Sequence, residues 1–134
     1  MPKPPLPSIV RDLLKQPNPA VIAANRPDGQ PVSVATWYLL EDDDRILINM
    51  DAGRRRLSYL RDDPRVSLTV LSEGNWGTHV SVQGRVVDLS PDVELAGIDR
   101  LAQHYTSGSY PVRNRDRVNG WIDIEFWHAW QLKE

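Results

Sequence analysis

Three consecutive arginines, Arg54, Arg55 and Arg56, form the densest positive charge in the sequence. The apolar spacing of Leu57 and Leu60 predicts a helix and places these arginines at its N-terminal turn. Cations at this end face the positive pole of the helix dipole, so the helix gains no stability from them. Free N–H groups and guanidinium groups do, however, bind phosphate. The pattern indicates an anion site formed mainly by Arg54 and Arg56, with Arg55 on the solvent side of the helix.

A second basic segment covers residues 113–117, with arginines at positions 113, 115 and 117. Side chains two residues apart in an extended segment share one side, which suits a long anionic tail. For both basic groups the alternative is a solvated surface. Beside the helix, the pairing partners would then be Asp51, Asp62 and Asp63. The residues alone leave both interpretations open.

The sequence has five tryptophans and a single phenylalanine. Trp37 lies at the end of a predicted strand and Trp76 lies in a loop, so either could cover a flat ring ligand. Ordinary burial is the alternative for both. Trp121, Trp127 and Trp130 fall in the last strands, where packing in the core or in a dimer is the better interpretation.

The composition excludes several types of catalysis. The sequence contains no cysteine, which rules out disulfides, zinc–thiolate sites and thiol catalysis. Its three histidines are scattered, so no metal site is predicted. No nucleophile elbow, Walker loop or GxGxxG turn is present, so no catalytic residue can be named and an organic cofactor would supply any chemistry. The formal net charge of −2 argues against general binding to nucleic acid or anionic membranes.

The chain of 134 residues is long enough for one domain with a core and too short for two ordinary ones. Residues 1–7 contain four prolines and predict an extended N-terminal arm, followed by a single domain over residues 8–134. No apolar run approaches the ~20 residues that span a bilayer, and no apolar signal core follows the first methionine. We therefore expect a cytoplasmic protein.

Alternating apolar residues and turn signals predict a mainly β domain with peripheral helices. Strands are expected at residues 20–24, 32–40, 45–50, 66–70, 80–86, 121–126 and 127–132. Helices are expected after Ser8, from Asp51 to Pro64 and from Ser90-Pro91 to Tyr105, and Gly84 is expected at a bulge or close approach. Six or seven strands with short connections suggest a closed antiparallel barrel.

In this order of elements the sequence resembles the pyridoxamine-phosphate-oxidase-like split β-barrels, and most closely their F-420-dependent branch. The resemblance runs from about residue 8 to residue 132. Its most specific part is the basic helix with the Asp-Pro-Arg-Val segment that follows it. The matching segments are residues 20–23, 26–34, 48–51, 53–67, 80–86 and 127–130.

The resemblance implies a homodimeric α+β split barrel with two cofactor sites between the barrels. It implies that the cofactor phosphate lies on Arg54 and Arg56, with Arg55 a weaker candidate, and that the arginine-rich loop, including Arg113, meets an anionic tail. The cofactor-ring residues that it implies are Val34, Thr36, Trp37, Asn49, Met50 and, as an aromatic cover, Trp76.

The activity implied by the resemblance is hydride transfer between deazaflavin F-420 and a small unsaturated organic substrate. Two alternatives remain open at this stage. One is an FMN-binding oxidoreductase on the same fold, and the other is a non-catalytic carrier of a cofactor or ligand. A nucleic-acid partner is the least favoured, because the chain is acidic overall and its basic residues are clustered.

Overall fold

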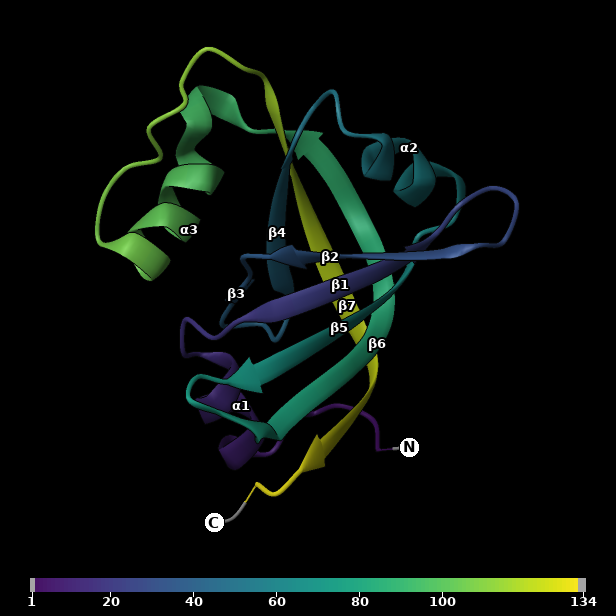
Figure 1. The fold of residues 1–134 in the computed structure, drawn as a ribbon, viewed down its shortest axis with the longest axis vertical. Helices are drawn as coiled ribbons and strands as arrows, with labels where there is room; N and C mark the ends of the chain where they lie inside the picture. Colours follow the sequence, from purple (N-terminus) through teal and green to yellow (C-terminus); the bar gives the residue numbers. More distant parts are fainter. Residues whose placement is uncertain (1, 133–134) are drawn as a thin grey trace.

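A computed structural model of the protein describes residues 2–132. One antiparallel sheet contains seven strands in the order β2-β1-β5-β6-β7-β4-β3 and curls into a barrel (Figure 1). The strands are β1 (Ala20–Asn25), β2 (Pro31–Thr36), β3 (Leu39–Leu40), β4 (Ile46–Asp51), β5 (Arg65–Ser72), β6 (Asn75–Pro91) and β7 (Arg117–Trp130). Because β2 and β3 lie at opposite ends of this order, the barrel is open between them. The predicted mainly β split barrel is confirmed.

The helices lie at the two ends of this barrel. Helix α1 (Ser8–Leu14) lies at the end that holds both chain termini, and α2 (Arg55–Asp62) and α3 (Ala96–Thr106) lie toward the other end (Figure 1). Segment 2–7 forms no helix or strand and contacts the barrel, since the Trp127 N–H donates to the Pro2 carbonyl and Leu6 is buried. Within residues 2–132, no helix combines the length and the apolar character needed to cross a membrane.

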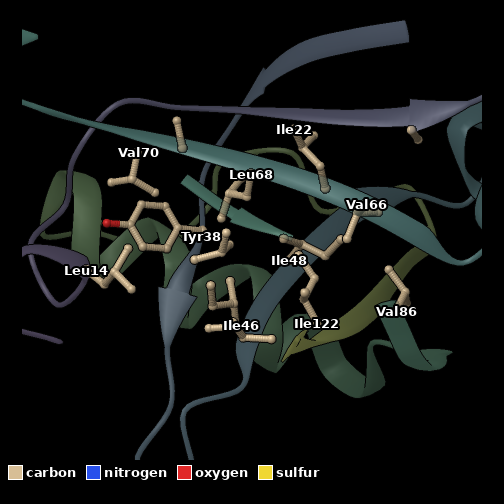
Figure 2. Packing of buried hydrophobic residues seen from close by; sticks show 14 of the residues in the cluster. Leu14, Ile22, Tyr38, Ile46, Ile48, Val66, Leu68, Val70, Val86 and Ile122 are labelled. Carbon is tan, nitrogen blue, oxygen red and sulfur yellow. The ribbon is translucent and has the colours of Figure 1, made fainter. Parts of the chain in front are cut away.

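The barrel core is formed by the inward residues of each strand, as alternation requires. Figure 2 shows Ile22, Leu68 and Ile48 directed toward one another, and each of the three is at most 1% exposed. Strand β4 is buried on both faces, because Ile46 and Ile48 face the barrel while Leu47 packs against α3. The residues from Ile46 to Met50 are buried although the strand lies next to the edge strand β3 and not in the centre of the sheet.

The helix expected from Asp51 begins later than predicted. Asp51 still pairs with Arg117 in the β4–β7 ladder, and its carboxylate accepts the Gly53 N–H at 2.8 Å, which forms a turn. Arg54 is the extended N-cap, and α2 begins at Arg55. The turn residues therefore displace the helix start by four positions.

The helix predicted to open at Ser90-Pro91 also starts later. Both residues belong to β6, which remains paired with β7 as far as Pro91 and Val118. A short 3-10 helix, η1 (Val93–Leu95), follows, and α3 is capped by Asp92, whose carboxylate accepts the Gly97 and Ile98 N–H groups. The pairing of a long strand outweighs the local Ser-Pro cap signal.

Two predicted strand boundaries are also different in the structure, and one predicted bulge is present. The predicted strand 32–40 is divided into β2 and β3, because Tyr38 turns into the core and donates its hydroxyl to the Gln16 carbonyl at 3.0 Å. The two predicted C-terminal strands form one continuous strand, β7. The prediction for Gly84 is confirmed, since the register shifts there and a Cβ would overlap the Asp123 carbonyl oxygen.

Candidate functional site

A groove of about 1010 Å³ lies on the open side of the barrel. Its walls come from β1 and β2 on one side, from α3 on another, and from the ends of β4, α2 and β7 that meet there. The predicted site residues that line it are Val34, Thr36, Trp37, Asn49, Met50, Arg54, Arg55 and Arg56. The structure thus brings the predicted ring-binding and phosphate-binding residues to one place.

One end of the groove is strongly cationic. Arg54 and Arg55 are exposed at its rim, and Arg56 is half-buried with an Nε that has no hydrogen-bond partner. Burial lowers the pKa of Arg56, and the nearby charges of Arg54 and Arg117 lower it further. A half-buried guanidinium with an unpartnered Nε, close to other positive charges, is costly without an anion.

The acidic residues beside α2 do not neutralise this cluster. Asp51 forms an ion pair with Arg115, and Asp63 binds Arg65 through two hydrogen bonds of 2.8 and 2.9 Å. Among residues 2–132, none of the arginines at positions 54–56 is in an ion pair. The alternative in which local aspartates pair with these arginines is therefore not the arrangement in the structure.

Arg117, which the sequence analysis named only as one of three arginines in the segment 113–117, also lines the groove. Its Nε donates to the Asn49 side-chain oxygen at 2.6 Å, and its guanidinium carbon lies 4.9 Å from the centroid of the Tyr110 ring. The sequence held one signal for it, the spacing of arginines in residues 113–117. Only the β4–β7 register, however, shows which of them reaches the groove.

Asn49 and Met50 form the floor of the groove and are 7% and 1% exposed. The Asn49 amide is fully used, because its nitrogen donates to Asp92 at 3.0 Å and to Asn119 at 2.7 Å. Asn49 was predicted to lie beside a cofactor ring. The structure gives its side chain a different immediate task, which is to hold Arg117.

An aromatic wall lies beside this floor. Trp37 stacks on Tyr105 with ring centroids 5.3 Å apart and planes 10° apart, and it meets Tyr110 edge-on at 6.2 Å. The Tyr105 hydroxyl donates to the Asn18 carbonyl at 2.7 Å, and burial raises its pKa to about 12. Tyr105 therefore remains a neutral, fixed support for Trp37.

Two predicted site residues lie outside the groove. Trp76 is 78% exposed and is the second residue of β6, directly after the turn at residues 73–74, so the predicted loop position is wrong by a small margin. Arg113 pairs with Asp99 through two hydrogen bonds of 2.9 and 3.0 Å, on the outer side of the 107–116 loop. Any role for either residue in ligand binding requires a partner or a ligand that extends beyond the groove.

These features together fit a phosphate-bearing ring compound. Ligand sites of drug-sized or cofactor-sized molecules are ~300–1,000 Å³ and mostly apolar, with a few convergent polar groups. This groove has apolar and aromatic walls, and the unpartnered Nε of Arg56 lies at its cationic end. Within residues 2–132, no group of three or more metal-ligating side chains gathers.

An open seven-stranded antiparallel barrel with a groove at its split defines a split β-barrel protein. The chain belongs to the pyridoxamine 5′-phosphate oxidase family, whose model matches residues 6–131. The predicted family is thus confirmed. No curated protein matches the sequence.

Several solved structures have the same fold. An F420 reductase is 25% identical, covers 92% of this chain and 98% of its own, and superposes with a TM-score of 0.82. A conserved hypothetical protein from Mycobacterium tuberculosis is 23% identical over 96% of this chain and 86% of its own, with a TM-score of 0.76. General Stress Protein 26 from Bacillus anthracis is 11% identical over 93% of both chains, with a TM-score of 0.69.

Proposed function

We propose that this protein is an oxidoreductase that uses deazaflavin F-420 to transfer a hydride to or from a small unsaturated organic substrate. The observation that carries the proposal is the unneutralised arginine cluster at one end of an aromatic-walled groove. The similarity to an F420 reductase over nearly the full length of both chains favours the deazaflavin.

The residues of the groove have distinct tasks in this proposal. Arg54 and Arg56 bind the phosphate, with charge-assisted hydrogen bonds that are shorter and stronger than neutral ones. Val34 and Thr36 on β2 lie along the ring, and Trp37 covers one side of it. Buried Met50 excludes water from beneath the ring.

When bound, the deazaflavin supplies the carbon centre that gives or accepts the hydride. The chain's own contribution is to orient the ring and to keep the reacting face dry, in a site where fixed donors act strongly. The hydroxyl of Tyr105 is already bonded to a carbonyl and has a raised pKa, so it positions Trp37 and does not move a proton.

FMN is the second candidate, because the matching family model describes pyridoxamine 5′-phosphate oxidase. Both molecules carry a phosphate and a flat tricyclic ring, and the groove can hold either one. Purified protein should be titrated with F-420 and with FMN side by side. Micromolar or tighter binding of F-420 with weaker FMN binding supports the proposal, whereas one FMN per chain that F-420 fails to displace contradicts it.

Binding alone does not separate an enzyme from a carrier. The protein with bound F-420, reduced by a separate reductase, should be mixed with a panel of cyclic enones. Oxidation of the cofactor that depends on both protein and enone indicates an enzyme. Tight F-420 binding without turnover of any enone indicates a cofactor carrier.

We further propose that the functional unit is a homodimer. The outward face of β1, β5, β6 and β7 carries mainly small, hydroxyl-bearing and aromatic residues, and charged residues lie at one end of the strands, at Arg65, Arg85 and Glu125. The solvent-facing side of a half-buried sheet usually carries polar and charged side chains. A mainly uncharged face therefore favours burial of this surface against the same surface of a second copy of the chain. The face comprises Val21, Ala23, Ser67, Thr69, Ser81, His128 and Trp130.

Such a dimer would also account for the exposure of Trp76. Its ring is 78% exposed at the tip of a hairpin and lies outside the groove of its own chain, so a neighbouring barrel is the surface that it can cover. Sedimentation at micromolar concentration should show twice the mass of the chain. A monomer at that concentration contradicts the proposal.

A further inference from the structure

Arg117 is held in one direction by two separate contacts. Its Nε donates to Asn49 at 2.6 Å, and its guanidinium lies over the Tyr110 ring at 4.9 Å. Among residues 2–132, no acceptor forms a hydrogen bond with its two terminal nitrogens. A side chain with many free rotamers is thus fixed at the edge of the groove, with its best donors unused.

Arg117 is supported by a polar cluster of buried Asn49, buried Asp92 and half-buried Asn119. Asp92 is 8% exposed and accepts hydrogen bonds from Asn49 at 3.0 Å and from Asn119 at 3.4 Å. Its own N–H donates to the Arg117 carbonyl at 2.9 Å, which closes the network. Because both hydrogens of the Asn49 amide point to Asp92 and Asn119, its oxygen must face Arg117.

Helix α3 locks this cluster in place. Asp92 accepts the N–H groups of Gly97 at 2.7 Å and Ile98 at 2.9 Å. Gly97 approaches Asn119 so closely that a Cβ at this position would overlap the amide oxygen. Each side-chain nitrogen and oxygen of the cluster has a hydrogen-bond partner. In this network only the terminal nitrogens of Arg117 remain free to bind a ligand.

We propose, on the basis of the proposed function, that Arg117 is a second arm of the anion site. Its terminal nitrogens bind the ligand phosphate from the β7 side, while Arg54 and Arg56 bind it from the α2 side. Asn49 and Asp92 are positioning residues that set the direction of Arg117. The charge of Arg117 lowers the pKa of Arg56, and both residues line the same groove, so the two guanidinium groups lie near each other.

This arrangement selects ligands by their phosphate and leaves the ring to the aromatic wall. Arg117→Ala should weaken binding of F-420 and of FMN roughly 10- to 100-fold, the usual effect of losing a charge-assisted hydrogen bond. Binding of riboflavin or of the phosphate-free deazaflavin should stay within about 2-fold. A general loss of folding would weaken the binding of all four ligands to a similar extent.

Two further variants distinguish direct contact of Arg117 with the phosphate from the positioning of Arg117 by Asn49. Arg117→Lys keeps the charge but loses the bond to Asn49 and the two-pronged geometry, so we expect it to restore only part of the phosphate affinity. Asn49→Ala removes the acceptor for Nε, and we expect a loss of roughly 3- to 10-fold for the phosphate-bearing ligands alone. Arg61→Ala, which removes an exposed arginine outside the groove, is the matched control.

The decisive experiment measures the dissociation constants of these four ligands for the wild type and the four variants at one ionic strength. A loss confined to phosphate-bearing ligands, with partial rescue by Arg117→Lys, supports the inference. Equal affinities of wild type and Arg117→Ala for F-420 and FMN overturn it and leave the proposed function intact.

Inorganic pyrophosphate tests the same arm without any flavin. It should raise the melting temperature of the wild type and of Arg61→Ala, but raise that of Arg117→Ala much less. If neither F-420 nor FMN binds, the proposed function fails, yet this stabilisation still supports the inference. If pyrophosphate stabilises wild type and Arg117→Ala equally, or stabilises neither, the inference is overturned.

Discussion

Two groups of arginines lie close to the groove, and they differ in what neutralises them. Arg113 and Arg115, in the loop before β7, pair with Asp99 and Asp51. Arg54, Arg55 and Arg56, at the start of α2, have no such partner among residues 2–132. The loop arginines therefore link the loop to the rest of the domain, and the helix arginines leave net positive charge at the groove.

The difference between paired and unpaired arginines indicates which of them serve stability and which serve ligand binding in the proposed function. Paired surface arginines contribute little to stability and are screened by salt. An unpaired cluster that includes a half-buried guanidinium works against folding, so its presence indicates an external anion. Under the proposed function, the same residue type thus stabilises the loop through ion pairs in one group and binds the phosphate in the other.

The largest expected effect is on the helix group. Arg56→Ala should raise the dissociation constant of F-420 or FMN by roughly 10- to 150-fold, and Arg54→Ala by at least about 10-fold. Arg55→Ala should cost only a few-fold, because Arg55 is exposed at the rim and acts through screened attraction. Fluorescence titration at fixed ionic strength measures all three, and equal small losses would place the phosphate elsewhere.

The same arginine should give no stability to the ligand-free protein. Arg56→Met keeps most of the apolar stem and removes a buried, unpartnered Nε together with a charge that Arg54 and Arg117 oppose. We expect its urea midpoint to equal or exceed that of the wild type in the absence of ligand. A clearly lower midpoint would mean that Arg56 has a structural role.

The next largest effect is expected on the free energy of unfolding, at the contact between α3 and β7, the strand that contains Arg117. Gly97→Ala forces a Cβ onto the Asn119 amide, and separating α3 from β7 should cost about 1–3 kcal/mol of unfolding free energy. Gly108→Ala is the matched control, because the nearest atom to a Cβ there is Thr106 Oγ1 at 3.9 Å. Similar unfolding midpoints for the two variants would show that α3 approaches β7 less closely.

Local signals in the sequence were sufficient for the barrel and for part of the groove. Alternation identified the strands, and the arginines at 54–56 were recognised because cations at a helix start need an explanation. Arg117 was named only as part of the segment 113–117, because its place in the groove depends on the pairing of β4 with β7, which are far apart in the chain. Arg113 lies outside the groove and is neutralised by Asp99, a long-range ion pair that the spacing of the arginines does not predict.

Acid should weaken the loop group first. The Arg115 guanidinium holds the pKa of Asp51 down at about 2, so this pair stabilises the fold above the ordinary carboxylate pKa near 4. The contribution is lost as the pH falls from about 4 toward 2. The melting temperature of Arg115→Ala should lie below that of the wild type at pH 7, and the gap should close across this range. A gap that persists at pH 2 would indicate packing and not charge.

The smallest effect is expected at Arg113, and it tests whether pairing is what separates the two groups. Its guanidinium is exposed and already bound to Asp99, so Arg113→Ala should change the F-420 dissociation constant less than about 2-fold. Asp99→Asn is the informative partner, because the amide oxygen still accepts the Tyr110 N–H while the negative charge is removed. Freed from its carboxylate, Arg113 should then attract the anionic tail of F-420 and strengthen binding a few-fold at low salt, with no gain for FMN. An unchanged F-420 affinity in Asp99→Asn would show that distance, and not neutralisation, keeps the loop arginines out of the site.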